Sequence, residues 1–409
     1  MLTRFEVKGF KSLVDVAVDL GAVNVFIGAN GSGKSNLLEA LGFFGSMASG
    51  NAEYEAYRFR GVRPGDPESF ICQFPNRLLD SMDLYARDDR TEYRLRLHPD
   101  RKRGWEILEE LIHFDDKIIL ERSESGAIIR KGDDPYPVRN GNPSPSKTIS
   151  SFVRLYFAFN KDFYQPDITS PNIPFVNADF FDRLTEYAIY APSTPQLRGF
   201  PDDIHRDPLG LCGSDLAKAL EEMAAADPTM IGPFDLDDVM DLIEWADGIM
   251  TNSVDRPSDS PVRLQFNDRY MLGQRNAISA TEASEGALYV LFLLALVGHE
   301  RSPRMFAVDN FDQALHPRLA RALTESICDQ ILADGTRQMF ATTHNPLVLN
   351  GLNLLDDRIR LFTVDRDAAG ASKIERVVVT EQLMAKAEEG FSLSELWTMG
   401  RLRGVPQNY

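Results

Sequence analysis

The chain has 409 residues, 43% of them hydrophobic, and a formal net charge of −17. This length predicts two lobes or one elaborated domain, and the acidic balance disfavours a protein coated in nucleic acid while leaving room for a local basic patch. The N-terminus has no signal-like apolar core, and the longest apolar stretch, residues 286–298, is shorter than the roughly 18 residues that cross a bilayer, so we predict a soluble cytoplasmic protein.

The first predicted elements surround a glycine-rich loop. Residues 5–20 form two predicted strands, and residues 23–27 form a short apolar strand. Residues 28–35 then read Gly-Ala-Asn-Gly-Ser-Gly-Lys-Ser, and a helix is predicted over residues 36–41. A G-x-x-x-x-G-K-S sequence between a strand and a helix is typical of a phosphate-binding loop.

The residues of this loop suit the chemistry of a bound nucleotide. Gly28, Gly31 and Gly33 let the backbone turn tightly, so that its N–H groups and the helix N-terminus converge on phosphate oxygens. Lys34 would reach the β- and γ-phosphates, and the Ser35 hydroxyl would hold Mg²⁺. The alternative is a chance glycine-rich turn, and the strand and helix on either side argue against it.

The middle of the chain is predicted to be rich in β-strands. Residues 42–67 lack periodicity and are expected to end the first compact unit. Residues 69–131 alternate polar and apolar side chains in short runs, which indicates an antiparallel meander. Residues 135–145 are rich in proline and in Asn/Gly pairs, which predicts a loop.

A strand and two helices are predicted next along the chain. The strand covers residues 187–190 and is followed by a loop as far as Pro208. Helices are predicted over residues 214–226, with Ser214 as the N-cap, and over residues 235–250. Together with the meander, these helices suggest a helical lobe beside a β-rich one.

Further candidate site residues lie in the last third of the chain. An apolar run at residues 305–308 ends in Asp309, which fits a strand-end carboxylate that holds Mg²⁺, although a plain strand end is the alternative. A later strand ends in His344, where a γ-phosphate contact is favoured over an ordinary surface histidine. Ser284 precedes an apolar helix at residues 288–297. It is either an N-cap or, with the backbone N–H groups behind it, an anion site for another subunit.

The order of these motifs resembles the ABC-type AAA ATPase heads of the RecF, SMC and overcoming-lysogenisation-defect (OLD) group. The matching segments are Phe10-Lys11-Ser12, the loop at residues 28–36, Ser284 with Gly286, Asp309, Leu315-His316-Pro317 and Thr343-His344-Asn345-Pro346. The resemblance is strong at residues 1–48 and 270–350 and weak between them. It implies an α/β fold, namely a P-loop NTPase head of ABC type with a mixed central sheet, an antiparallel β subdomain and a helical lobe.

The resemblance also implies the ligands and the roles of residues. ATP with Mg²⁺ would be bound by Gly28, Asn30, Gly31, Ser32, Gly33, Lys34, Ser35 and Asn36, with Ser35 and Asp309 at the metal. Such heads dimerise head to tail around ATP. Ser284 and Gly286 would therefore contact the γ-phosphate held by another subunit of a homodimer or higher homo-oligomer, and His344 would be the switch histidine.

The chain departs from this group where a catalytic glutamate is usual. The pattern D-E-P-E-x-x-L-H-P is replaced by a sequence that begins Asp309-Asn310-Phe311-Asp312. An amide at position 310 cannot accept the proton of the attacking water, so we predict slow hydrolysis and a long-lived ATP-bound dimer. Asp312 or Glu285 could substitute as the base, and the sequence leaves this open. Gln196 is a candidate for the Q-loop glutamine.

The C-terminal part narrows the prediction of function. OLD nucleases carry a nuclease domain after the head, whereas here a strand at residues 360–365 follows, with no second acidic cluster of metal-binding character. Asp365 and Asp367 flank Arg366 in a segment that we interpret as a solvated turn. Any nuclease or toxin activity would then belong to a separate effector protein, as in the stand-alone ATPase component of a bacterial anti-phage defence system.

Two other functions remain as alternatives. An SMC/RecF-like DNA-binding ATPase would use a basic patch from residues 101–103 with Arg58, Arg60 and Arg63, although such short charge runs are more often solvated loops. A membrane transporter's nucleotide-binding subunit is disfavoured by the N-terminal strands and the weak signature sequence. The expected domains are the phosphate-loop part of the core (1–48), a β-rich insertion (49–200), a helical subdomain (201–265), a C-terminal ATPase lobe (266–366) and a tail (367–409).

Overall fold

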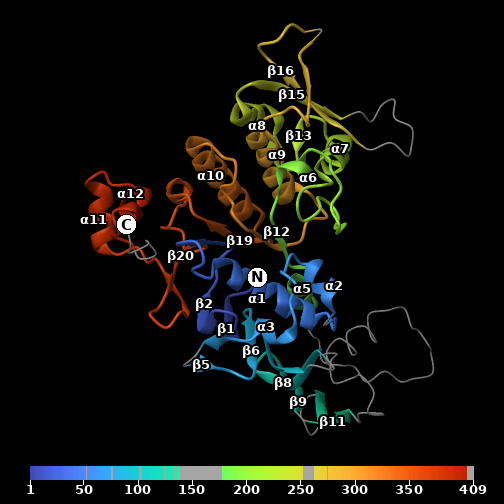
Figure 1. Ribbon diagram of the computed structural model, residues 1–409, viewed down its shortest axis with the longest axis vertical. Coiled ribbons are helices and arrows are strands. Elements are labelled where there is room, and N and C mark those ends of the chain that lie inside the picture. Colours follow the sequence, from blue (N-terminus) through green and yellow to red (C-terminus); the bar gives the residue numbers. More distant parts are fainter. Residues whose placement is uncertain are drawn as a thin grey trace, which may run out of the picture. The chain divides into compact units, whose positions relative to one another are not determined.

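The chain folds into two compact units. The computed structural model describes residues 1–51, 53–74, 77–100, 104–123, 126–131, 134–138, 177–251, 262–273 and 275–402. In this described part, the first unit comprises residues up to 187 together with 360–377, and the second unit comprises residues 188–359 and 378–402. Figure 1 labels the elements of both units. The domain boundaries expected from the sequence stay predictions.

The first unit contains an antiparallel sheet with the strand order β11-β10-β9-β8-β7-β6-β1-β2. Its strands are β1 (Arg4–Phe10), β2 (Leu13–Asp19), β6 (Met82–Arg87), β7 (Thr91–Asp100), β8 (Gly104–Phe114), β9 (Lys117–Ser123), β10 (Gly126–Lys131) and β11 (Asp134–Val138). The predicted meander is confirmed. The loop predicted at residues 135–145 is wrong over its first part, because Asp134–Val138 pairs with β10 despite its prolines, and residues 139–145 lie outside the described residues.

Helix α1 (Lys34–Ala48) fills the space against this sheet. Phe44 stacks on Tyr93 of β7 with ring centroids 4.9 Å apart, and Phe43 meets the edge of the Trp105 ring at 5.1 Å. The predicted helix end at residue 41 is wrong. Gly45 passes so close to α5 (Ala178–Glu186) that a Cβ atom there would lie 2.1 Å from the Leu184 carbonyl oxygen. The missing side chain of Gly45 therefore allows α1 and α5 to pack closely.

Three further strands of the first unit are β3 (Val23–Ile27), which precedes the phosphate loop and α1, and the hairpin of β20 (Ile359–Arg366) and β21 (Ser372–Arg376). The fully buried strand β3 has β20 as a neighbour, and β20 pairs antiparallel with β21. Phe26 and Phe362 stack with centroids 4.9 Å apart. The short elements of this unit are α2 (Tyr54–Arg58), α3 (Pro67–Phe70), β4 (Gln73–Phe74) and β5 (Arg77–Leu78).

The second unit contains a parallel arrangement of β12 (Ala188–Tyr190), β18 (Met305–Val308) and β19 (Gln338–Thr343), in that order. All their residues are buried, which explains why these strands consist of apolar and small residues apart from Gln338. Because neighbouring parallel strands end at the same edge, the residues that follow β18 and β19 lie close together. These are the predicted site residues Asp309 and His344.

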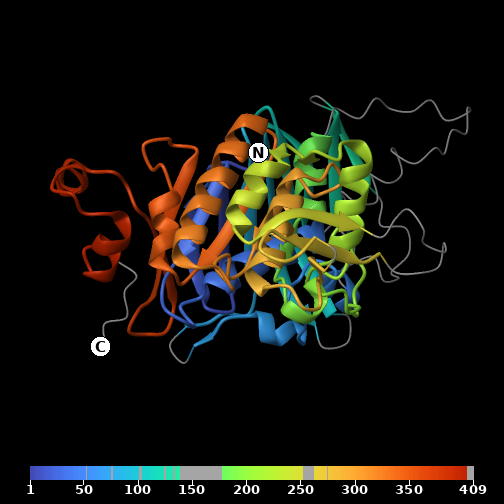
Figure 2. The same cartoon turned by 90° about the horizontal axis from the view of Figure 1, so that it is seen from above.

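Helix α9 (Glu285–Gly298) is the core of the second unit, and its residues from Ala287 to Val297 are buried. It packs against α6 (Thr194–Leu197), α7 (Leu216–Ala226), α8 (Leu236–Ile243) and α10 (Pro317–Asp334). Figure 1 and Figure 2 show the longer helices of this unit, coloured green to orange, beside one another. Helix α9 is apolar on every face because it is buried within the protein on every side. No helix in the described part of the chain combines the length and the apolar character needed to cross a bilayer.

Two details of the predicted helices are wrong. The N-cap of α7 is Asp215 and not Ser214. The helix predicted over residues 235–250 ends at Ile243, because Glu244 leaves the helical conformation, with a positive φ of 59°. The following residues form β15 (Ala246–Thr251), which pairs with β16 (Leu264–Asp268), and β16 pairs with β17 (Ala277–Ser279).

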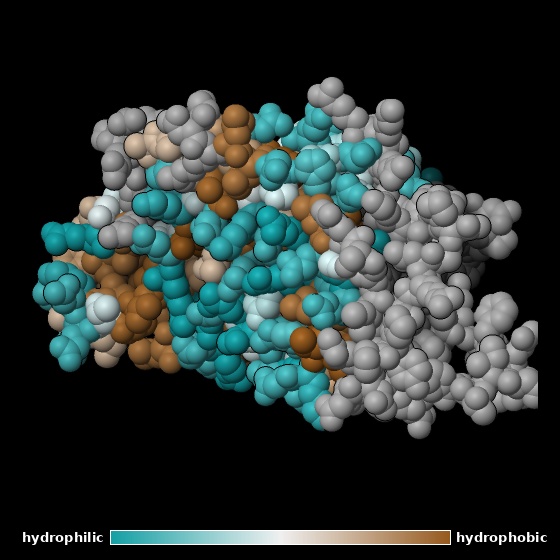
Figure 3. All heavy atoms as spheres, turned by 90° about the horizontal axis from the view of Figure 1, so that it is seen from below, coloured by the Kyte–Doolittle hydropathy of each residue, from teal (hydrophilic) through white to brown (hydrophobic). Residues whose placement is uncertain are grey.

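The remaining elements of the second unit are short. They are the hairpin of β13 (Met230–Ile231) and β14 (Phe234–Asp235), the 3-10 helix η1 (Pro346–Gly351), and the helices α11 (Glu381–Glu388) and α12 (Leu393–Thr398). Asn350 of η1 binds Ser394 of α12 through two hydrogen bonds of 2.9 and 3.1 Å. Figure 3 shows one face of the molecule, where hydrophilic side chains are interrupted by separate hydrophobic areas.

Candidate functional site

The phosphate loop has a backbone that only glycine allows at several positions. Gly31 and Gly33 adopt φ angles of 75° and 110°, in the left-handed region. A Cβ atom on Gly33 would lie 2.0 Å from the Ser372 hydroxyl oxygen, and one on Gly28 would lie 2.1 Å from the Val364 carbonyl oxygen. The loop is therefore pressed against the β20–β21 hairpin, and Gly33 caps α1 without a side chain of its own.

The polar side chains of the loop fit a phosphate group. Lys34 is 5% exposed, and its Nζ donates to the carbonyl oxygens of Gly28 at 2.9 Å and Ala29 at 3.0 Å. The Ser32 hydroxyl is buried and has no hydrogen-bond partner among the described residues. A buried hydroxyl without a partner is unfavourable, and a phosphate oxygen would satisfy it. Asn30 is exposed, while Ser35 and Asn36 are half-buried.

A chain of hydrogen bonds supports the loop from behind. Asn36 Nδ2 donates to Ser12 Oγ at 2.7 Å, Ser12 Oγ lies 2.7 Å from Ser372 Oγ, and Ser372 Oγ donates to the Ser32 carbonyl oxygen at 2.6 Å. Since Ser372 donates to Ser32, Ser12 is the donor to Ser372. The turn between β1 and β2 and the start of β21 thus fix the position of the loop.

Arg366 holds the tip of the loop. Its Nε donates to the Gly31 carbonyl oxygen at 2.7 Å, and its Nη1 donates to the Gly370 carbonyl oxygen at 2.9 Å. The interpretation of this segment as a solvated turn is therefore wrong for Arg366, because its side chain contacts the phosphate loop. Sequence reasoning also missed Ser372, which is 340 residues away from Ser32 along the chain.

Replacing Ser372 by Ala is expected to weaken ATP binding while the protein stays folded. The change removes one buried hydrogen bond to the loop, worth about 1 kcal/mol, or roughly a fivefold loss of affinity. Titration with a fluorescent ATP analogue measures it. Ser69→Ala is the matched control, because Ser69 Oγ also donates to a carbonyl oxygen, that of Asp66, at 2.6 Å. Equal affinity of the Ser372→Ala variant and the wild type would contradict this role.

The arginines of the predicted basic patch are engaged in structural contacts. Arg60 is buried and donates to the carbonyl oxygens of Ala56 at 3.1 Å and Thr185 at 2.7 Å. Arg63 pairs with Glu39, and Arg58 lies 3.9 Å from Glu55. Burial thus removes Arg60 from the predicted patch, whereas the patch stays a prediction for Arg58 and Arg63. Its other members, residues 101–103, lie outside the described residues.

The edge of the second unit where β18 and β19 end collects several of the predicted catalytic residues. Asp309 Oδ1 accepts a hydrogen bond from Thr342 Oγ1, and the same hydroxyl accepts from the Asn310 backbone N–H at 2.9 Å. Phe311 N–H donates to the Thr342 carbonyl oxygen at 2.8 Å. Asp309 is thus fixed by the neighbouring strand. Its carboxylate, like the hydroxyl of Ser35, offers the oxygen ligands that Mg²⁺ prefers.

Asp312 is fixed next to the predicted switch histidine. Its Oδ1 accepts from Thr343 Oγ1 at 2.6 Å and from the His344 backbone N–H at 3.4 Å. Asn310 itself is exposed and adopts a left-handed φ of 58°. Glu285, the other carboxylate that the sequence left open, accepts a hydrogen bond from Thr194 of α6. The structure therefore brings Asp312 to the strand edge with Asp309, Asn310 and His344.

Ser284 and Gly286 lie at the N-terminal end of α9. Ser284 is the N-cap, and its Oγ accepts from the Ala287 N–H at 3.3 Å, which confirms the predicted cap. A cavity of about 690 Å³ opens beside this helix end, and its lining includes Ser284, Gly286, Trp245 and His316. The Q-loop candidate Gln196 is bound within its own loop: it accepts from Ser193 and donates to the Pro201 carbonyl oxygen at 3.5 Å, and its role stays a prediction.

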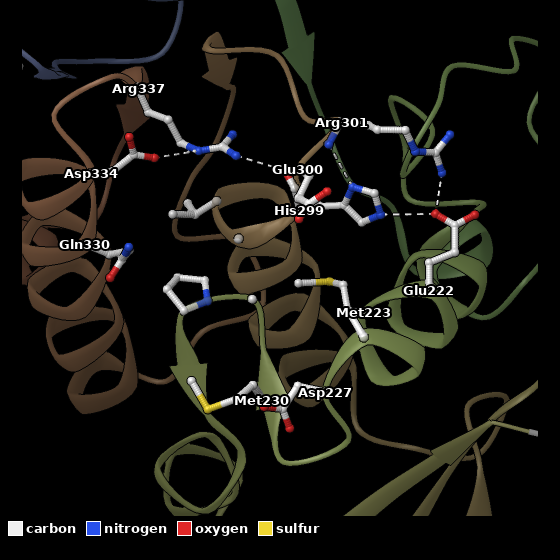
Figure 4. Close-up of a pocket in the computed structure, with 15 residues that line it drawn as sticks. Glu222, Met223, Asp227, Met230, His299, Glu300, Arg301, Gln330, Asp334 and Arg337 are labelled. Carbon is white, nitrogen blue, oxygen red and sulfur yellow. Dashed lines mark hydrogen bonds and ion pairs between the residues drawn. The ribbon is translucent and has the colours of Figure 1, made fainter.

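A second pocket, of about 580 Å³, lies at the opposite end of α9 and is lined by none of the predicted site residues. Figure 4 shows that its charged groups face one another. His299 Nδ1 accepts from the Arg301 N–H at 3.1 Å, so its Nε2 donates to Glu222 at 3.1 Å, and Arg301 also pairs with Glu222. Burial lowers the pKa of His299. We interpret these pairs as structural.

Strand, glycine-rich loop and helix, with a strand-end aspartate elsewhere in the chain, define a P-loop nucleoside triphosphatase. Residues 23–350 match the model of a family described as "AAA domain, putative AbiEii toxin, Type IV TA system", and the chain belongs to this family. No curated protein matches the chain.

A solved structure shows the same fold. The chain is similar to an SMC head bound to the C-winged helix domain of ScpA, with 13% identity, a TM-score of 0.54, and coverage of 94% of this chain and 99% of that one. The chain also matches an SMC head with an extended coiled coil from Pyrococcus furiosus, bound to the C-terminal domain of ScpA. This match has 15% identity, a TM-score of 0.47, and coverage of 95% of this chain and 98% of that one. The chain thus belongs to an AAA family and has the fold of an SMC head, and the predicted α/β fold class is confirmed.

Proposed function

We propose that this chain is a nucleotide-gated switch. ATP closes a head-to-tail homodimer, and the closed dimer controls a separate effector protein in bacterial anti-phage defence. The observation that carries the proposal is the cavity at the N-terminal end of α9, lined by Ser284 and Gly286. A helix N-terminus attracts anions, so this end suits the γ-phosphate of ATP held by a second copy of the chain.

The roles of the residues in each head follow from their chemistry. Lys34 and Ser32 would bind the phosphates, Ser35 and Asp309 would supply oxygen ligands to Mg²⁺, and His344 would respond to the γ-phosphate. Bound Mg·ATP supplies the phosphoryl group that water attacks. Asp312 is the carboxylate that accepts the proton of this water, because Asn310 lacks basicity and Asp312 lies in the turn that directly follows Asp309, next to His344. Hydrolysis is slow, so the closed dimer persists long enough to act on the effector.

A protein partner is in keeping with this fold. One solved SMC head of the same fold is bound to the C-winged helix domain of ScpA. A head can therefore serve as a platform for another protein. The family description, with its mention of a toxin and a toxin–antitoxin system, supports a defence role in which the toxic activity is controlled.

Molecular mass in the presence of ATP tests the switch. The 45.9 kDa chain is expected to be monomeric without nucleotide and to double in mass with ATP and Mg²⁺. Ser284→Arg is expected to stay monomeric, since an arginine at the helix end fills the phosphate site, while loss of the cap costs only about 1 kcal/mol of stability. Ala333→Arg adds the same charge at an exposed position of α10 and is the control. Dimerisation of the Ser284→Arg variant as readily as the wild type would contradict the proposal.

A further inference from the structure

The N-terminal half of α9 is joined directly to the turn that follows β18. The hydroxyl of Tyr289 donates to the backbone carbonyl oxygen of Asn310 at 2.9 Å. The Tyr289 side chain is only 1% exposed, and burial, followed by the carboxylates of Asp312 and Asp309, raises its pKa. The phenol is therefore protonated and able to donate at any working pH.

The turn at residues 310–314 is held at both of its left-handed residues by α9. Asn310 has φ 58° and Ala314 has φ 62°, conformations that need support from the surroundings when the residue is not glycine. The Tyr289 hydroxyl binds the carbonyl oxygen of the first of these residues, Asn310. Gly286 faces the second so closely that a Cβ atom on Gly286 would lie 3.0 Å from the Ala314 carbonyl oxygen. The helix end and the turn are thus packed as one body.

The same turn carries the residues of hydrolysis. Asp312 lies within it and is bound to Thr343, while Asp309 directly precedes it and is bound to Thr342. A displacement of α9 along or around its axis pulls on the Asn310 carbonyl through Tyr289. It thereby changes how the Asp312 carboxylate is presented, although β19 holds Asp312 from the other side.

We propose that Tyr289 is a positioning residue that couples the two ATP sites of the dimer. A phosphate bound at Ser284, on the end of α9, sets the conformation of the turn at residues 310–314 in the same subunit. This inference rests on the proposed function, because the phosphate is presented by a second head. It adds that ATP on one head prepares the other head for hydrolysis, so that turnover is positively cooperative in ATP.

The variant Tyr289→Phe keeps the packed ring and removes the hydrogen bond. We expect it to bind ATP and to dimerise as the wild type does. Its kcat is expected to fall by about fivefold, the lower end of common coupling effects. Its Hill coefficient for ATP is expected to fall below that of the wild type but to stay above 1, because dimerisation by ATP is itself cooperative. Ala314→Gly, which loosens the other end of the turn without touching α9, is expected to lower the Hill coefficient as well.

Tyr93→Phe is the matched control, because the Tyr93 hydroxyl is also buried and donates a single hydrogen bond, to Glu110 at 3.1 Å, in the antiparallel sheet of the first unit. It is expected to lose as much thermal stability as Tyr289→Phe and to keep the Hill coefficient of the wild type. Unchanged kcat and Hill coefficient in both Tyr289→Phe and Ala314→Gly would overturn the inference. A wild type that stays monomeric with ATP would instead overturn the proposed function.

Discussion

The Lys34→Ala variant is expected to lose ATP binding almost completely. The Lys34 ammonium is buried inside the phosphate loop and bound to the Gly28 and Ala29 carbonyl oxygens, so it is held where it can turn to a phosphate. A charge-assisted hydrogen bond to a phosphate contributes about 2–3 kcal/mol, which corresponds to a loss of affinity of roughly 30- to 150-fold. Titration calorimetry with ATP and Mg²⁺ measures the affinity.

Lys8→Ala is the control for this variant. Lys8 lies on β1 with its side chain 52% exposed and pairs with Asp15 at 3.4 Å, so its loss removes one positive charge outside the loop. We expect Lys8→Ala to bind ATP normally. Binding by Lys34→Ala within about twofold of the wild type would show that the loop at residues 28–35 is not the ATP site.

The Asn310→Glu variant is expected to hydrolyse ATP faster than the wild type. A carboxylate at this position can accept the proton of the attacking water, and a positioned general base contributes about 100-fold or more to rate. Part of the gain is offset because Asn adopts the left-handed φ of 58° more readily than Glu, a difference of about 1 kcal/mol in the stability of the turn. We therefore expect a rise of about tenfold or more in phosphate release at saturating ATP.

Two companion variants separate basicity from shape. Asn310→Gln has the size of the glutamate variant without its basicity, and it is expected to stay slow. Asp312→Asn is expected to reduce the slow rate of the wild type to background, because it removes the carboxylate that Thr343 and His344 hold at the strand edge. Ordinary turnover in the wild type that is unaffected by Asn310→Ala would contradict the prediction of slow hydrolysis.

The parts of the site predicted from the sequence are those that depend on local pattern. The phosphate loop, the strands before it, the Ser284 cap and the strand that precedes Asp309 all follow from periodicity, glycine spacing and capping within a few residues of each other. Helix α1 extends beyond its predicted end for a reason that is not local, namely the close contact between Gly45 and Leu184. Pattern alone treats such a glycine as a break.

The parts that the sequence left open depend on contacts between distant segments. Ser372 and Arg366 support the phosphate loop only because the β20–β21 hairpin returns to the first unit, and no signal near either residue reveals this. The surroundings of Asp312 and Glu285 are similar in this respect. Each carboxylate accepts a hydrogen bond from a distant threonine, Thr343 for Asp312 and Thr194 for Glu285, which are 31 and 91 residues away along the chain.

Mixing two inactive variants tests most directly whether each ATP site is completed by a second chain. Lys34→Ala lacks a working phosphate loop, and Ser284→Arg lacks a working α9 end, so neither is expected to dimerise alone with ATP and Mg²⁺. In a mixture, the loop of the Ser284→Arg chain meets the intact Ser284 of the Lys34→Ala chain, and one complete site forms. The account predicts an ATP-dependent heterodimer in the mixture, detected by mass with one of the two chains tagged. Continued absence of a dimer in the mixture, with full dimerisation of the wild type under the same conditions, would contradict it.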